Sequence, residues 1–141
     1  MAPNEEQTSI PENYSETGVG SGFSAAAGPF YRWNGEGPTR MAFRALEKHA
    51  NPIGRVHGGA LMTLADQASG HAIARSLDEK RPFATVSLNC DFLAAARTGD
   101  WVEAEATITR RTRSLVFTHV RIFSGDELLL TASGIWKFLG E

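Results

Sequence analysis

One stretch of the chain limits the architectures that it can adopt: residues 51–66 begin as a loop and continue into a helix. Pro52 and Gly54 keep the first half irregular. From Val56 to about Leu77, apolar residues recur at helical spacing, so the sequence predicts a long helix that packs on a core. The stripe that faces this core consists of Leu61, Leu64, Ala65, Ala68 and Ala72.

Two adjacent glycines, Gly58 and Gly59, stand where this helix begins. Each costs roughly 1 kcal/mol of helix stability relative to alanine, so we expect them to have a use. The first N–H groups of a helix have no internal partner and carry partial positive charge, so bare backbone there can hold an oxyanion. Tight packing of the helix start against a strand is the alternative, and the glycines alone favour neither.

Asp66 is the only acidic residue between Asn51 and Leu77, and no basic residue lies three or four positions away from it. On a helical wheel it lies roughly 140° from Leu61, on a flank of apolar or very small residues. An unpaired carboxylate buried on such a flank is expensive and usually functional. We therefore expect a second buried surface here, against another subunit, and a catalytic Asp66 in preference to a surface one.

The remaining segments predict an α+β fold. Residues 1–22 are polar and show no period, which predicts a disordered or loosely docked tail before a single domain at 23–141. A short helix ending at Gly28, a first strand and a strand at 41–48 come before the long helix. Four strands follow it at 83–93, 101–109, 115–123 and 128–139. One helix between an early hairpin and an antiparallel meander is an α+β pattern.

In the strand at 83–93, the alternation puts two sets of side chains on opposite faces. Ala84, Val86, Leu88, Cys90 and Phe92 form one set, and Thr85, Ser87, Asn89 and Asp91 form the other. We expect the apolar set to face the core and the polar set to face solvent.

The composition excludes several classes of protein. The net charge of −2 gives no attraction toward nucleic acid or anionic membranes, and no apolar run approaches 18 residues. The acidic, polar start shows no secretory signal, so we expect a cytoplasmic protein. The single Cys90 cannot form an internal disulfide. The histidines His49, His71 and His119 lack the spacing of metal ligands, so we assign no metal.

The run Asn51-x-x-Gly54-x-Val56-His57-Gly58-Gly59, followed by Thr63-Leu64-Ala65-Asp66, resembles the signature of hotdog-fold thioesterases of the PaaI-like group. Gly28-Pro29-Phe30-Tyr31 and Phe43-Arg44 are also similar to that group, and the resemblance covers about residues 28–139. It implies a curved antiparallel sheet wrapped around a central helix. It also implies hydrolysis of acyl- or aryl-coenzyme A thioesters, in which coenzyme A is part of the substrate and no further cofactor is needed.

The resemblance assigns Asp66 as general base or nucleophile and leaves both open. The Gly58 N–H would hold the thioester oxygen, and Gly59 would share that role. Asn51 would place the water or the carbonyl, with capping of a loop turn as the alternative. We expect His57 to orient the loop by hydrogen bonding in preference to transferring protons.

Ser87 aligns with a strand position that orients water in some members of the family, with an ordinary solvent-facing residue as the alternative. Thr63 lies one turn before Asp66 and could bond to its carboxylate or back to the helix. Basic turns contain Arg97 and the group Arg110, Arg111 and Arg113. They could pair with the phosphates of coenzyme A or remain solvated.

The expected assembly is a dimer or a dimer of dimers, with Gly58 of one chain facing Asp66 of another. A non-catalytic acyl-coenzyme A binding module and a thioesterase that acts on acyl carrier protein are the alternatives. Hydration or dehydration of an enoyl thioester normally uses a different Asp/His motif, which the sequence lacks. The identity of the acyl group stays open.

Overall fold

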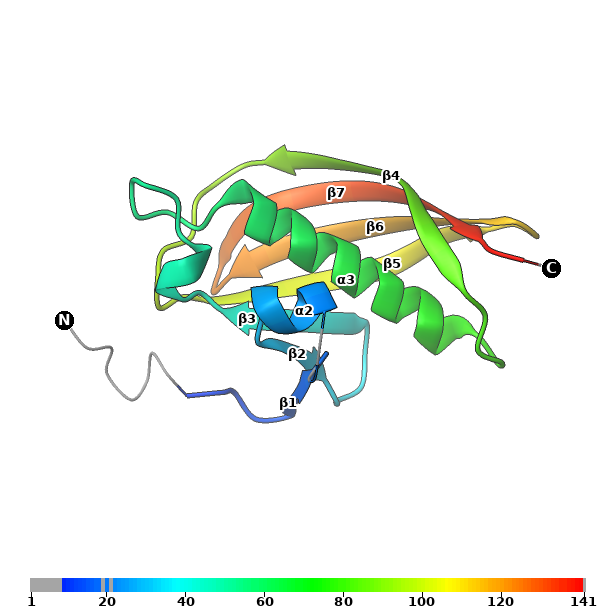
Figure 1. Ribbon diagram of the computed structural model, residues 1–141, viewed down its shortest axis with the longest axis horizontal. Helices are drawn as coiled ribbons and strands as arrows, with labels where there is room; N and C mark the ends of the chain where they lie inside the picture. Colours follow the sequence, from blue (N-terminus) through cyan, green and yellow to red (C-terminus); the bar gives the residue numbers. More distant parts are fainter. Residues whose placement is uncertain (1–8, 19, 21, 141) are drawn as a thin grey trace.

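The computed structural model describes residues 9–18, 20 and 22–140. Within these residues, a single antiparallel sheet curves around a long helix, α3 (Gly58–Ser76) (Figure 1). The strands are β1 (Tyr14–Thr17), β2 (Phe30–Trp33), β3 (Thr39–Arg44), β4 (Phe83–Phe92), β5 (Trp101–Arg111), β6 (Leu115–Ser124) and β7 (Glu127–Phe138). Their order across the sheet is β1-β2-β3-β5-β6-β7-β4. A short helix, α2 (Gly22–Ala27), and a 3-10 helix, η1 (Glu47–His49), complete the described chain. The α+β hotdog prediction is confirmed.

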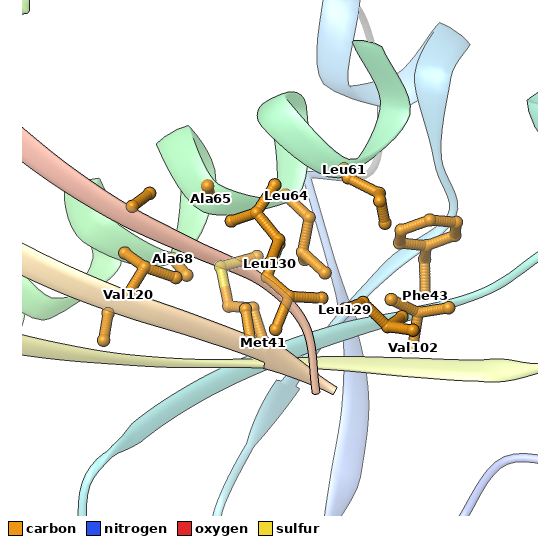
Figure 2. Packing of buried hydrophobic residues seen from close by; sticks show 14 of the residues in the cluster. Met41, Phe43, Leu61, Leu64, Ala65, Ala68, Val102, Val120, Leu129 and Leu130 are labelled. Carbon is orange, nitrogen blue, oxygen red and sulfur yellow. The ribbon is translucent and has the colours of Figure 1, made fainter. Parts of the chain in front are cut away.

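Helix α3 packs on the sheet through the stripe that the sequence predicts. Leu61, Leu64, Ala65 and Ala68 are buried there, with exposed fractions of 2% or less. Figure 2 shows these side chains pointing toward the sheet residues Met41, Phe43, Val102, Leu129 and Leu130. Full burial of a large aliphatic side chain contributes about 1.5–3 kcal/mol, so this contact fixes α3 on the sheet.

A chain of buried hydrogen bonds fixes how α3 is aligned with the sheet. The indole Nε1 of Trp136 donates to Thr118 Oγ1 at 3.1 Å, and the Thr118 hydroxyl donates to Ser69 Oγ of α3 at 3.2 Å. A Cβ at Gly134 would lie 2.8 Å from Thr118 Oγ1 and 2.9 Å from Trp136 Nε1. Position 134 therefore has no room for a side chain.

The N-terminal segment differs from the prediction of a tail. Residues 14–17 form β1 and pair with β2 in register, so this portion of the predicted tail belongs to the sheet. The Tyr14 ring contacts Trp33 and Trp101, with centroid distances of 5.3 and 5.2 Å, and these contacts anchor a strand too short to show a period. The tail prediction for residues 1–8, 19 and 21 lies outside the described residues.

The strand predicted at 41–48 ends early. β3 stops at Arg44, and residues 47–49 turn into η1 instead. The side chain of His49 causes this turn, because its Nδ1 accepts the Leu46 N–H at 2.9 Å and its Nε2 donates to Ala27 O at 2.6 Å. The predicted short helix before Gly28, with a strand after it, is confirmed by α2 and β2.

The alternation predicted for β4 is broken by a β-bulge. The register against β7 shifts between Thr85 and Ser87, which leaves Val86 as the extra residue. Before the bulge, Phe83 packs on the cluster around Ile73; after it, Leu88 and Cys90 pack on the main core. Because the bulge exchanges the two faces of the strand, Thr85 faces α3 and Ser87 faces away from it.

Candidate active site

The carboxylate of Asp66 lies midway along α3 and is partly exposed. Its Oδ1 accepts a hydrogen bond from Thr85 Oγ1 at 2.8 Å. As the sequence predicts, no basic side chain forms an ion pair with Asp66 among the described residues. A neutral donor contacts it instead, because the bulge in β4 turns Thr85 toward the helix. Thr85 is the site residue that the sequence pattern missed, since uninterrupted alternation places it on the solvent face.

The N–H group of Gly58 begins α3 and has no acceptor among the residues that the structure describes. A Cβ at this position would lie 3.1 Å from the edge of the Phe92 ring. Both uses considered for this glycine are therefore compatible with the geometry: the helix start packs closely on β4, and its first N–H is free.

The second glycine is already engaged in hydrogen bonds. The N–H of Gly59 donates to Nδ1 of His57, the N-cap residue of α3, at 2.8 Å. The carbonyl of Gly59 accepts from Thr63 Oγ1 at 2.8 Å. Thr63 therefore makes the back-bond to the helix and does not bond to Asp66. A shared oxyanion role for Gly59 would require this N–H to leave its capping partner.

Asn51 organises the loop that leads into α3. Its Oδ1 accepts from the N–H groups of Ile53 at 3.1 Å and Arg55 at 3.0 Å. Gly54 donates its N–H to Asn51 O and has a φ of 80°, a backbone conformation that favours glycine. The side-chain amide nitrogen of Asn51 has no partner within the described portion of the chain. Asn51 thus caps the loop and keeps two N–H donors for another group.

Two residues of the predicted site lie apart from Asp66 within one chain. Gly58 and Asp66 are eight positions apart on a single helix, which corresponds to about 12 Å along its axis. One thioester carbonyl cannot contact both within the same chain. Ser87 lies on the opposite face of β4, where its Oγ accepts from Asn89 Nδ2 at 3.2 Å. Within one chain, Thr85 and not Ser87 contacts Asp66, and the water-orienting role expected for Ser87 stays a prediction.

The four candidate arginines fall into two separate groups. Arg97 pairs with Arg55 in an isolated β-bridge beside the start of α3, where Val56 N–H also donates to Ala96 O at 2.9 Å. Arg110, Arg111 and Arg113 lie instead around the turn between β5 and β6. Any single phosphate would therefore meet one group or the other within a chain.

An open pocket of about 520 Å³ lies between α2, η1 and the first turns of α3. Its apolar lining comes from Phe23, Ala26, Ala27, Phe30, Phe43 and Ala60. Its polar lining comes from Lys48, His49, His57, Gly59 and Thr63. We call this space the α2 pocket.

The described residues contain neither a cluster of side chains that could hold a metal ion nor a helix that could cross a membrane. Within residues 9–18, 20 and 22–140, no three His, Cys, Asp or Glu side chains gather so that they could hold a metal ion. In the same residues, no helix has the length and apolar character needed to cross a membrane.

Known proteins share both sequence and fold with this chain. Residues 53–131, more than half of the chain, match the family model described as the thioesterase superfamily. A Pseudomonas aeruginosa protein, named provisionally as an esterase, is 36% identical over 128 residues, which cover 90% of this chain and 96% of the relative. Human acyl-coenzyme A thioesterase 13 is 30% identical over 88 residues, 62% of each chain.

Solved structures show the same fold. The phenylacetic acid degradation protein PaaI from Thermus thermophilus, solved as a mutant, superposes with a TM-score of 0.72 at 24% identity. The match covers 82% of this chain and 97% of that one. Taken together with the free Gly58 N–H and the Thr85-bound Asp66 on one central helix, these matches show that the chain belongs to the thioesterase superfamily of hotdog-fold proteins.

Proposed function

We propose that this protein hydrolyses acyl- or aryl-coenzyme A thioesters to the free acid and the coenzyme A thiol, as a cytoplasmic homodimer or dimer of dimers. Membership of the thioesterase superfamily supports the reaction class. The name of the human relative supports coenzyme A as the thiol carrier in preference to acyl carrier protein. One observation carries the site: Gly58 and Asp66 share a helix but lie about 12 Å apart along it, so a complete site needs two chains.

The edge of the sheet supports such an assembly. β4 is an edge strand that pairs only with β7 among the described residues. Val86, Phe92 and Leu93 expose apolar side chains along this edge, and Met62 of α3 adds another. Long apolar edge strands are normally covered. A two-fold partner that pairs with β4 would bring its own α3 alongside and place its Gly58 toward Asp66.

The chemistry follows from the free groups. Thr85 holds Oδ1 of Asp66, which leaves Oδ2 to take a proton from water or to attack the carbonyl carbon itself. The Gly58 N–H would stabilise the oxygen as it becomes negative, a contribution of about 3–4 kcal/mol in comparable sites. Water then supplies one hydroxyl to the acid, and its proton goes to the departing thiolate.

The first test measures thiol release from short, medium and aromatic acyl-coenzyme A esters. We expect turnover by the wild type and a loss of about a hundredfold or more in Asp66→Asn, equivalent to about 3 kcal/mol of barrier. Undiminished turnover in the variant would remove Asp66 from the mechanism. No turnover of any ester by the wild type, with tight binding of one, would instead indicate a binding module.

The second test asks whether the backbone N–H of Gly58 takes part in the reaction. Gly58→Pro removes the N–H at the first helical position, where proline is tolerated, and His57 before it already has an extended backbone. Gly58→Ala adds bulk beside Phe92 but keeps the N–H, so it serves as the matched control. We expect the proline variant to lose far more activity than the alanine variant.

Mixing the inactive variants then reports on the interface. Asp66→Asn and Gly58→Pro chains are unfolded together and refolded at equal concentrations, so that mixed dimers form. One of the two sites in each mixed dimer has both intact groups, so about a quarter of the wild-type activity should return. No recovery, with mixed dimers demonstrated by mass spectrometry, would contradict the shared site.

The basic groups are proposed phosphate contacts for coenzyme A. Arg97 lies beside the start of α3, whereas Arg110, Arg111 and Arg113 lie at the other end of the sheet. If either group binds the nucleotide end, its alanine variants will raise KM for a coenzyme A ester but not for the corresponding pantetheine ester, which lacks those phosphates. Equal KM changes for both esters would contradict this role.

A further inference from the structure

We propose that the α2 pocket receives the acyl group of the thioester and that α2 sets the upper limit on its length. This inference rests on the proposed function and adds the identity of the substrate's acyl group. Its basis is the chemistry of the pocket lining, its position next to Gly58 and the origin of its outer wall.

The polar groups of the lining are mostly satisfied by the protein itself. Both ring nitrogens of His49 are bonded, to Leu46 N–H and Ala27 O. The Thr63 hydroxyl donates to Gly59 O, and the Gly59 N–H donates to His57 Nδ1. A polar ligand would therefore find few hydrogen-bond partners in this pocket, whereas an alkyl or aryl group needs none.

Two polar groups remain, and both belong to exposed side chains. The ammonium of Lys48 donates to Ala26 O at 3.0 Å and retains two further donors. The Nε2 of His57 has no partner within the described residues. These two groups do not alter the apolar character of the rest of the lining, so we assign the pocket to an apolar ligand.

The pocket adjoins the proposed oxyanion site. His57 and Gly59 both line it, and they flank Gly58 in the sequence. A thioester whose oxygen accepts from the Gly58 N–H would therefore have the entrance of the pocket within reach of its acyl carbons. A dry cavity of about 150 Å³ holds a benzene ring. The 520 Å³ here accommodates a larger group, and we assign medium-length alkyl chains and phenylalkyl groups to it.

The outer wall of the pocket is α2, which lies outside the segment matched by the family model, residues 53–131. Among the described residues, three side-chain hydrogen bonds hold α2 against the rest of the chain. Gln67 Nε2 bonds to Ser24 Oγ at 2.6 Å, and Lys48 and His49 bond to the carbonyls of Ala26 and Ala27. The reacting groups and the wall that would select the acyl chain therefore come from different regions of the sequence.

The test fills the pocket from its outer wall. Ala26→Trp places an indole into the space from an exposed position of α2, so the variant should fold. Ala25→Trp adds the same group to the same helix at an exposed position that does not line the pocket, and serves as the matched control. We expect Ala26→Trp to lower kcat/KM for octanoyl- and decanoyl-coenzyme A by about tenfold or more, with acetyl- and propanoyl-coenzyme A hardly changed.

A second variant opens the same wall. Phe23 lines the pocket and has an exposed fraction of 70%, so Phe23→Ala should not impair folding. We expect a several-fold loss in kcat/KM for the longer esters only. A loss that is equal for all chain lengths, or no change in either variant, would overturn the assignment. A change of oligomeric state in Ala26→Trp by light scattering, with no chain-length effect, would identify the pocket as an interface between copies instead.

Failure of the proposed function would be recognised separately. If the wild type hydrolyses no ester, calorimetric titration of Asp66→Asn with decanoyl-coenzyme A and acetyl-coenzyme A still tests the pocket. The same titration is made with a double variant that carries both Asp66→Asn and Ala26→Trp. If the double variant binds the decanoyl ester more weakly but the acetyl ester equally well, the result supports the acyl pocket. Equal binding by both proteins would overturn it.

Discussion

The hydroxyl of Thr85 donates to Oδ1 of Asp66 at 2.8 Å and joins the edge strand β4 to the middle of α3. This bond fixes one carboxylate oxygen, whereas the other has no hydrogen-bond donor in the part of the chain that the structure describes. The bond also fixes the direction of the Asp66 side chain. No basic residue lies three or four positions away on α3 to hold the carboxylate in its place.

Removal of this hydroxyl should lower activity without unfolding the protein. For Thr85→Val we expect kcat to fall by about tenfold, equivalent to about 1.4 kcal/mol, because the Asp66 side chain loses its orienting donor. Thr85→Ser keeps the hydroxyl and should retain most activity. Ser87→Ala alters the opposite face of β4 and should have little effect. A larger loss in Ser87→Ala than in Thr85→Val would contradict the geometry.

Asn51 can be tested for its two separate capacities. Asn51→Asp keeps an oxygen that accepts from Ile53 and Arg55 but loses the amide donors. Asn51→Ala loses both, and we expect it to reduce stability to urea by about 1–2 kcal/mol. If the amide contacts substrate or water, both variants will lose activity while only the alanine variant loses stability. Full activity in Asn51→Asp would leave Asn51 with the capping role alone.

The stability of the protein should be sensitive to a methyl group added at Gly134, which lies close to the indole of Trp136. Gly134→Ala places a Cβ 2.8 Å from Thr118 Oγ1, so we expect a loss of about 1–3 kcal/mol in the free energy of unfolding, measured in urea. Gly70→Ala is the comparison, because its Cβ would lie 3.6 Å from Phe83, an ordinary contact. That variant should be neutral or more stable by up to about 1 kcal/mol. Equal stability of the two variants would contradict the packing.

Two buried or half-buried histidines predict how stability depends on pH. Burial lowers the pKa of His49 below its ordinary 6.5, and burial together with Arg75 and Arg32 lowers the pKa of His71. The unfolded chain therefore binds more protons just below pH 6.5 than the folded chain does. The stabilising contribution is fully present above about pH 6.5 and is lost as the pH falls toward the folded values.

Unfolding in urea at pH 7.5 and pH 5.5 measures this effect. We expect the wild type to be less stable at pH 5.5. His49→Gln and His71→Gln each remove one titrating group, so each should reduce the difference between the two pH values, and the double variant should reduce it most. A difference unchanged in the double variant would assign the pH dependence to other groups.

The long helix and the strands of the meander could be predicted from the sequence because their periods are long and regular. The start of α3 was also predictable, since Gly58 and Gly59 mark it. β1 could not be predicted, because four residues show no period and their anchor is the contact of Tyr14 with two distant tryptophans. The early end of β3 depends on His49, whose partner Ala27 lies 22 residues away.

The site was only partly predictable, for a similar reason. Asp66 and Gly58 are recognisable from local sequence, but the hydrogen-bond partner of Asp66 is not. The extra residue Val86 exchanges the two faces of β4, so that Thr85 and not Ser87 faces the helix. An alternating sequence does not show at which residue such a β-bulge occurs. The α2 pocket likewise depends on contacts of α2 with residues more than 20 positions away in sequence.

The bulge at Val86 also limits how strands of other copies can add to this sheet. A uniform edge strand of ten residues with exposed apolar side chains would accept incoming strands in several registers, which is the route to open-ended aggregation. The extra residue increases the local twist and interrupts the ladder of backbone hydrogen bonds. An added strand must accommodate that interruption, so the same irregularity that turns Thr85 toward Asp66 favours a single closed pairing over a growing fibril.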